Sequence, residues 1–434
     1  MPCDLWVDRR PCFDDKGAMR ASTATNDDNE AGIPVPDNAN RYERQKQRIV
    51  DAATILLNRK GMRGMTLADV AGELGLTTTS VTYYFRRKEQ LVAAVFEDAL
   101  ARLAAMVHEA GREPTPRARV ARYVELYFED FAQARRERGR PIANLSEMRS
   151  MDGEARSRLI AQYRTIRRAV RGFFGPPTDE ARKRLLTARA HILNEALFWQ
   201  DTWLGQFAIG DLPNVRRRFF RILDGGITTA GTAWDARIIE PDAMTGPGEQ
   251  ESFLRVATRL INDTGYRGAS VKRIMAELNR TKGSFYHHLD AKDDLIVSCW
   301  RISHRRLADL RAKAYGEHES PWRRISTTVT SALALQLANE FPLLRVTAYQ
   351  AMPPAVRDLA LLYAQRTALG VMGALVEAMA EGTVRPIDPL IASHLILSSI
   401  NAAHDLQGGH EGQSIEEAIA TYETVLGEGL FDPE

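Results

Sequence analysis

Two stretches of the chain concentrate hydroxyl, amine and aromatic side chains within two helical turns. The first follows Thr77 and contains Thr78, Thr79, Ser80, Thr82, Tyr83 and Tyr84. The second follows Thr281 and contains Lys282, Gly283, Ser284, Tyr286, His287 and His288. Hydroxyl groups can hydrogen-bond to bases or phosphates, threonine methyl groups fit against thymine, and a lysine can contact guanine or phosphate. These residues are therefore candidates for contact with the major groove of DNA.

The first stretch lies on the second of two short helices predicted within residues 67–86. The first of these helices has an apolar stripe formed by Leu67, Val70, Ala71 and Leu74. Gly75 breaks the pattern where a chain leaving a helix adopts a positive φ, and Thr77 caps the next helix. Val81 and Phe85, four residues apart, face the core. A glycine turn between two helices, the second with a polar outer face, predicts a helix-turn-helix.

Helix starts around this motif offer further phosphate contacts. Thr66 with Asp69 three residues on predicts a capping box. The N-termini of the helices that begin after Thr66 and Ser270 present free N–H groups to a phosphate. Lys88 and Lys292 stand at the start of the next helices and are candidates for the same role.

The motif is repeated without a gap. Gly61 and Gly265, Thr77 and Thr281, and Lys88 and Lys292 are pairs with one constant offset in sequence number. In the second copy, whose motif covers residues 271–290, Asn279 replaces Gly75, and asparagine tolerates a left-handed turn best after glycine. A constant offset through the whole motif indicates a tandem duplication. Outside the motif the two halves show no matching register.

Composition sets broad limits on the chain. It has 434 residues, 44% hydrophobic and 26% charged, and a formal net charge of +2, so charge neither favours nor excludes nucleic acid. Its three cysteines, Cys3, Cys12 and Cys299, form no disulfide or zinc pattern, which predicts a cytoplasmic protein. We expect no membrane span and no signal peptide. No phosphate loop, nucleophile elbow or metal spacing is found, so we expect no enzyme, cofactor or metal.

Helical periodicity without convincing strand alternation predicts an all-α fold. Residues 1–40 are polar and predict a disordered tail. The expected domains are a helix-turn-helix domain at 44–104, a helical regulatory domain at 105–233, a linker at 234–250, a second helix-turn-helix domain at 251–308 and a second regulatory domain at 309–434.

Both copies resemble the N-terminal domain of TetR-family transcriptional regulators. The matching residues are 52–53, 61, 66–71, 75–77, 80–81, 84–85 and 88–91 in the first copy, and 257, 265, 270, 274, 281–288 and 292–295 in the second. The chain departs from the family at Thr82, where Tyr is usual, at Asn279 and at Leu289, where Phe is usual. The change at Thr82 would remove a phosphate contact from the first copy or move it to Tyr83.

The resemblance implies two TetR-like halves fused in one chain. It further implies double-stranded operator DNA as partner, and a small, largely apolar effector that releases a repressor from it. The family pairs its last two long helices with those of a partner. Here the helices expected at 179–204 and 213–229 would pair with those at 389–406 and 414–426, giving a pseudo-dimer within the chain; a homodimer is the alternative.

Effector contacts are less well defined by the sequence. The candidates are Trp199, Trp203, Tyr349 and Tyr363, although aromatic residues at helical spacing are more often core or bundle interface. We expect Cys299 to pack in a helix, Arg216, Arg217 and Arg218 to form a solvated helix face, and the adjacent histidines of the second motif to bind no metal. Two other functions stay open: a ligand-independent architectural DNA-binding protein, and a helical enzyme or adaptor that keeps the motif as scaffold.

Overall fold

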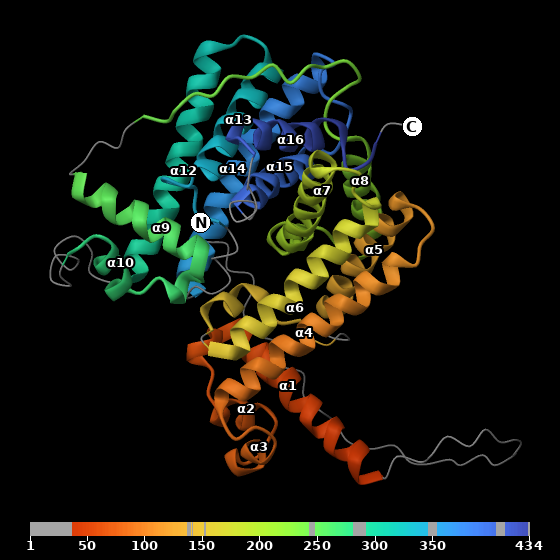
Figure 1. Ribbon diagram of the computed structural model, residues 1–434, viewed down its shortest axis with the longest axis vertical. Helices are drawn as coiled ribbons and strands as arrows, with labels where there is room; N and C mark the ends of the chain where they lie inside the picture. Colours follow the sequence, from red (N-terminus) through yellow and green to blue (C-terminus); the bar gives the residue numbers. More distant parts are fainter. Residues whose placement is uncertain are drawn as a thin grey trace, which may run out of the picture. The chain divides into compact units, whose positions relative to one another are not determined.

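The computed structural model describes residues 37–136, 140, 142–151, 153–242, 248–280, 292–345, 354–404 and 413–432 (Figure 1). The chain forms two units, residues 1–45 and 46–434, and the second contains both copies of the motif. The described residues contain helices and no strand, as the sequence predicts. The expected tail falls largely on residues 1–36, which lie outside the described part.

The first half carries the following elements: α1 Asp37–Gly64, α2 Leu67–Glu73, α3 Thr78–Tyr84, α4 Lys88–Gly111, α5 Pro116–Arg135, η1 Leu145–Ser150, α6 Gly153–Arg171, η2 Gly172–Phe174, α7 Glu180–Trp199, η3 Gln200–Thr202, η4 Leu204–Gln206, η5 Ile209–Asp211 and α8 Leu212–Gly225. The second half carries α9 Gly248–Gly268, α10 Val271–Glu277, α12 Lys292–Glu317, α13 Pro321–Ala338, α14 Pro354–Ala380, α15 Pro389–Ala403 and α16 Ile415–Glu428.

Two predicted helix ends in the first half were wrong. α7 ends at Trp199 rather than at residue 204, and short 3-10 turns follow it. α8 ends at Gly225 rather than at residue 229, because Gly226 has φ 64° and turns the chain away from the helix. Positive φ at this point favours glycine. The segment after Gly226 then hydrogen-bonds to the second half instead of continuing α8.

The predicted linker is packed over its first part. Trp234 meets Trp322 edge to face at 5.0 Å between ring centroids, and its Nε1–H donates to Thr330 Oγ1 at 3.0 Å. The Ile239 N–H donates to Ser331 Oγ at 3.0 Å. Arg237 pairs with Glu317 of α12, and Lys313 Nζ donates to the Glu240 carbonyl at 2.7 Å. Residues 234–242 therefore form an extended strap along α12 and α13. Residues 243–247 lie outside the described part.

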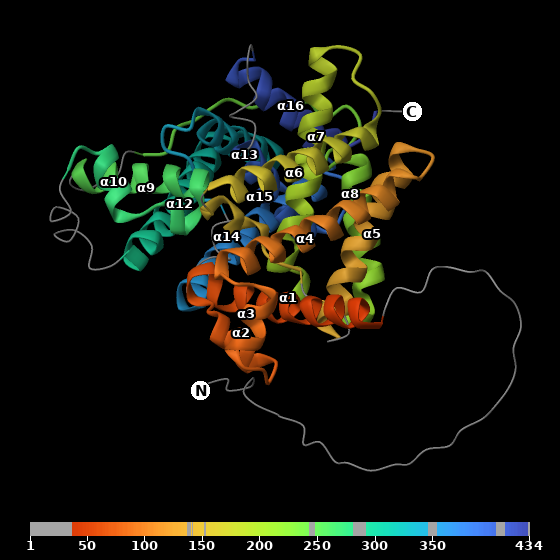
Figure 2. The same ribbon diagram turned by 60° about the horizontal axis from the view of Figure 1, so that its bottom comes forward.

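The two halves are joined through their last helices, as the sequence predicts. α7 packs along α15 and contacts α16, while α8 contacts both α15 and α16 (Figures 1 and 2). The Ile227 N–H donates to the Leu426 carbonyl at 3.0 Å, and the Leu430 N–H donates to the Leu223 carbonyl at 2.8 Å. Ile227 and Leu430 each follow the last helix of their half, and each bonds to the end of the other half's last helix. Such reciprocal contacts are those of a two-fold dimer interface.

Among the described residues, α14 is long and apolar enough over residues 356–380 to cross a membrane, by length and composition only. No such segment was expected from the sequence. α14 also packs against α12, α13 and α15, and a core helix passes the same test. The helix therefore carries no argument for a membrane.

Candidate nucleic-acid interface and regulatory core

The N-terminus of α2 is held by a complete capping box. Thr66 Oγ1 accepts from the Asp69 N–H at 3.0 Å, and Asp69 Oδ2 accepts from the Thr66 N–H at 2.8 Å. Lys60 Nζ lies 2.8 Å from Asp69 Oδ1. The hydrogen bond from Lys60 and those from Thr66 lower the pKa of Asp69 to about 2. The acidic side chain thus occupies the helix start at which we expected a phosphate.

α3 presents its polar residues outward. Val81 and Phe85 are buried, whereas Tyr83 is 71% exposed. Thr77 Oγ1 accepts from the Ser80 N–H at 3.2 Å and so caps the helix. The hydroxyl of Thr82 donates to the Thr79 carbonyl at 3.0 Å. α3 therefore has the buried and exposed faces that a recognition helix requires.

The turns of the two copies have the same backbone geometry. Gly75 has φ 64° and Asn279 has φ 52°, which confirms that asparagine takes the glycine's place. The N–H after each bonds back into the preceding helix, from Leu76 to the Ala71 carbonyl at 2.8 Å and from Arg280 to the Met275 carbonyl at 2.9 Å. Ser270 caps α10, since its Oγ accepts from the Arg273 N–H at 3.2 Å.

The start of α10 carries charges that the sequence analysis missed. Lys272 and Arg273 are exposed at the positions that Ala68 and Asp69 occupy in the first copy. Cations in the first turn oppose the helix dipole, so they are not there to stabilise α10. The constant offset between the copies was the signal that could have found them.

An asparagine at the end of each motif's first helix clamps an extended segment of the regulatory core. The Asn58 Nδ2–H donates to the Ile142 carbonyl at 2.8 Å, and the Asn144 N–H donates to Asn58 Oδ1 at 3.0 Å. In the second copy the Asn262 Nδ2–H donates to the Leu343 carbonyl at 2.9 Å. We call these pairs the asparagine clamps.

The second clamp closes in the same way, because the Arg345 N–H donates to Asn262 Oδ1 at 2.9 Å. Equivalent asparagines thus make the same two bonds in both halves, so the repeat continues into the regulatory domains, where the sequence showed no register. The segment after the first clamp also touches both copies. Glu147 accepts a hydrogen bond from the Met62 N–H, and η1 packs against α9.

Two cavities lie side by side in the core of the first half. The larger, the apolar cavity, has about 390 Å³ and is lined among others by Met106, Tyr127, Phe131, Asn58, Asn144 and Arg357. The smaller, the arginine cavity, has about 280 Å³ and is lined among others by Arg156, Arg164, Arg167, Arg345, Glu195 and Asp263. Four residues line both: Leu103, Tyr127, Leu145 and Phe198. The first asparagine clamp borders the apolar cavity through Asn58 and Asn144, and the second borders the arginine cavity through Arg345.

Comparison with known proteins decides the family of the repeated motif. The family model "Bacterial regulatory proteins, tetR family" matches residues 49–95 and 253–299. The chain carries two TetR-family DNA-binding domains in tandem. Over 92 residues it is 30% identical to the HTH-type transcriptional regulator BetI of Brucella anthropi, which covers 20% of this chain and 47% of that protein. BetI of Burkholderia thailandensis is 32% identical over 90 residues, 20% of this chain and 46% of that protein. The chain thus spans about half the length of the curated relatives it matches.

Two solved structures are also similar to part of this chain. AibR in complex with isovaleryl coenzyme A and operator DNA has 15% identity and a TM-score of 0.34, over 39% of this chain and 95% of that one. PfmR of Thermus thermophilus has 20% identity and a TM-score of 0.32, over 40% of this chain and 96% of that one.

Several predicted contacts of the TetR-type domains fall outside the described residues. These are Thr281, Lys282, Gly283, Ser284, Tyr286, His287 and His288, together with the candidate effector residue Tyr349. Lys292 begins α12 and Lys88 begins α4, as predicted. In the first domain the structure brings Thr78, Thr79 and Tyr83 together on the exposed face of α3.

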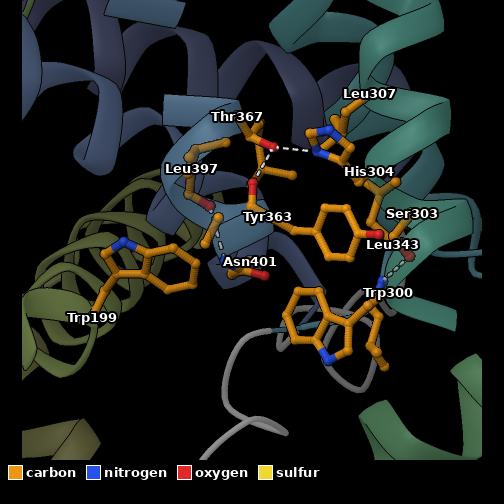
Figure 3. Close-up of a pocket in the computed structure, with 13 residues that line it drawn as sticks. Trp199, Trp300, Ser303, His304, Leu307, Leu343, Tyr363, Thr367, Leu397 and Asn401 are labelled. Atoms are coloured by element: carbon orange, nitrogen blue, oxygen red, sulfur yellow. Dashed lines mark hydrogen bonds between the residues drawn. The ribbon is translucent and has the colours of Figure 1, made fainter. Parts of the chain in front are cut away.

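The candidate effector residues divide between a small cavity and the interface of the halves. Trp199 and Tyr363 line one cavity of about 50 Å³ in the second half (Figure 3). Trp203 is buried and stacks on His394 at 5.8 Å between ring centroids. The Trp199 Nε1–H donates to His394 Nδ1 at 3.0 Å, and burial lowers the pKa of His394 to about 4. The neutral imidazole can therefore accept this bond across the interface.

The sequence also led to expectations for Cys299 and for the arginine run on α8. Cys299 is buried, as predicted, and burial raises the pKa of its thiol to about 12. The arginine run on α8 is not simply solvated: Arg216 pairs with Glu125, and Arg218 Nη1 lies 2.7 Å from Asp388 Oδ2. Asp388 caps α15, so this pair links the two halves. The expectation was wrong because the facing elements supply carboxylates.

Proposed function

We propose that this chain is a cytoplasmic, sequence-specific DNA-binding transcriptional regulator in which one chain supplies both DNA-binding domains. It represses its target genes until a small molecule enters the helical core. The observation that carries the proposal is α3, whose capped N-terminus, buried apolar side and outward hydroxyl and tyrosine side chains suit the major groove.

The two domains would contact DNA with different residues. In the first, the exposed residues Thr78, Thr79 and Tyr83 would contact base edges and phosphates. Thr66, Thr77, Ser80, Thr82, Tyr84 and Lys88 surround them. In the second domain the proposed contacts are Ser270, residues 281–284 and 286–288, and Lys292. Because these sets differ, the operator is an imperfect palindrome or a direct asymmetric site, and its two half-sites have different sequences.

Lys272 and Arg273 add phosphate contacts to the second domain. The first helix of a helix-turn-helix crosses the DNA backbone, so exposed cations at its start can reach phosphates. Asp69 makes the same place acidic in the first domain. The second domain therefore contributes more of the salt-dependent affinity than the first.

Regulation follows from where the cavities lie. Asn58 and Asn144 line the apolar cavity, and Arg345 lines the arginine cavity. A ligand there touches both clamped segments, and so it can favour one arrangement of the two DNA-binding domains over another. A ligand-independent architectural role leaves both cavities without a use.

Selection from a random duplex library with the full chain, followed by footprinting, tests this function. We expect one asymmetric operator with two half-sites. Thr79→Val should alter the base preference of one half-site only, because it removes a hydroxyl and keeps the shape. Lys272→Ala should weaken binding to all sequences and lower the slope of log affinity against log salt by about 1. Binding with no sequence preference would refute the proposal.

A further inference from the structure

The cavities of the two halves lie at equivalent positions of the repeat but differ in volume. Leu103 lines both first-half cavities, and Leu307, its equivalent in the register of the repeat, lines the second-half cavity. Ile142 is held by the first clamp and lines the apolar cavity. Leu343 is held in the same way by the second clamp and lines the second-half cavity. The duplication therefore placed a cavity at this position in each half. The first-half cavities hold about 390 and 280 Å³, and their counterpart holds about 50 Å³.

Aromatic side chains fill the second-half cavity. Trp300 and Tyr363 enter it from α12 and α14, and Trp199 enters from α7 of the first half (Figure 3). The His304 ring lies 5.1 Å from the Tyr363 ring between centroids, and His304 Nδ1 hydrogen-bonds to Thr367 Oγ1 at 2.7 Å. About 50 Å³ is far below the roughly 300–1,000 Å³ of ligand pockets. The second-half cavity therefore has no room for an effector.

Among the described residues that line it, the arginine cavity has more cationic than acidic side chains. Arg156, Arg164, Arg167 and Arg345 face two acidic residues, Glu195 and Asp263. Arg345 is fully buried, and its Nη2 lies 3.5 Å from Glu195 Oε2. Asp263 Oδ1 lies 3.3 Å from His404 Nε2. Arginine stays charged, and its planar donors match carboxylates and phosphates.

A second buried polar group faces the adjoining apolar cavity. Gln200 is 3% exposed and lines this cavity, and its Oε1 has no hydrogen-bond partner among the described residues. A buried amide oxygen without a donor costs free energy, and a ligand that offers it an O–H or N–H removes that cost. Asn58, Asp130, Asn144 and Arg357 also line this cavity, and the rest of its wall is apolar.

We propose that each chain binds one effector, in the first half only, and that this effector is an anionic amphiphile. Its apolar body occupies the apolar cavity, and its anionic group lies among the arginines of the arginine cavity. This assignment rests on the function proposed above. Arg345 comes from the second half, and its backbone N–H closes the second asparagine clamp. The anionic group would therefore compete with Glu195 for Arg345 and reach the second DNA-binding domain directly.

Calorimetric titration of the full chain with four ten-carbon probes tests the assignment. The probes are decanoate, decyl phosphate, decan-1-ol and decylammonium. We expect at least one of the two anions to bind with one site per chain, about tenfold or more tighter than the alcohol, because a hydrogen bond to a charged group is lost with the alcohol. The stronger anion separates a carboxylate effector from a phosphorylated one. Decylammonium should bind weakest of the four.

Two arginine variants and a matched control locate the anion. Arg164→Met and Arg156→Met should each weaken binding of the preferred anion about tenfold and leave decan-1-ol unchanged. Arg168→Met, one turn further along the same helix and not among the residues that line the cavity, should change neither. Two sites per chain, equal binding of the alcohol and the anions, no effect of Arg164→Met, or no binding by any probe would each overturn the inference.

Operator binding by the same preparations separates this inference from the proposed function. If the anions do not bind as expected but the chain still binds its operator, the inference is wrong and the protein is a DNA-binding regulator with another kind of effector. Anion binding as expected without any specific DNA binding overturns the proposed function and leaves the cavity assignment standing.

Discussion

The second asparagine clamp can be broken by one substitution, Asn262→Ala. The side chain is 2% exposed and makes two hydrogen bonds of 2.9 Å to the backbone of residues 343 and 345. Each bond contributes about 0.5–1.5 kcal/mol net, and the carbonyl and N–H left behind are shielded from water, which adds to the loss. We therefore expect the opening free energy of α9 to fall by about 2–4 kcal/mol.

Native-state hydrogen exchange of the α9 amides measures this opening directly, since regions open locally with their own free energies. Asn58→Ala is the matched control: its two bonds, of 2.8 and 3.0 Å, have the same geometry, but Asn58 is only partly buried. Water can replace part of what is lost there, so we expect about 1 kcal/mol for α1. A change below about 0.5 kcal/mol in Asn262→Ala would refute the claim that the clamp holds the second domain to the core.

Three further outcomes follow from the structure. Gly226→Ala should destabilise the chain by about 3 kcal/mol or more in urea unfolding, because Gly226 has φ 64° and an added Cβ would lie 2.0 Å from the carbonyl oxygen of Gly427 at the end of α16. Gly231→Ala, with φ 81° and open space around it, should cost only about 1–2 kcal/mol. Equal losses of stability in the two variants would contradict this interface. The pKa of Asp69 is lowered to about 2, chiefly by the hydrogen bond from Lys60. The ionised Asp69 therefore stabilises the folded chain fully above its ordinary pKa of 3.8, and this effect is lost as pH falls through about 2. Amide exchange of α2 should rise between these two pH values, and a titration midpoint of Asp69 near pH 4 would be the contrary result. Cys299 should resist iodoacetamide at pH 8 in the native chain and react in urea, as peptide mass spectrometry would record; rapid native labelling would be inconsistent with its buried thiol and a pKa of about 12.

Local rules were enough to predict the DNA-binding domains from the sequence. The caps at Thr66, Thr77 and Ser270 and the turns at Gly75 and Asn279 depend on neighbours within a few residues, and the structure has all five. The pairing of the last helices was also predictable, since it follows from the tandem repeat once the family resemblance is known.

Long-range contacts escaped the sequence analysis. The partners of Asn58 and Asn262 lie far along the chain in the regulatory domains, and an asparagine late in a helix gives no sign of such a partner. The strap at 234–242 shows the same limit: its composition is that of a linker, and partners on α12 and α13, far along the chain, make it a packed element. Nor did the sequence distinguish the cavities of the two halves, because Trp199 fills the second from the other half of the chain.

The central claim is that one chain forms a complete two-domain DNA-binding unit. Light scattering of the purified chain mixed with its selected operator duplex tests this most directly. We predict one chain of 48.6 kDa per duplex, because the helices that pair two subunits in a dimer are already paired within the chain. A complex containing two chains on each duplex, with the free protein also at twice 48.6 kDa, would contradict the account.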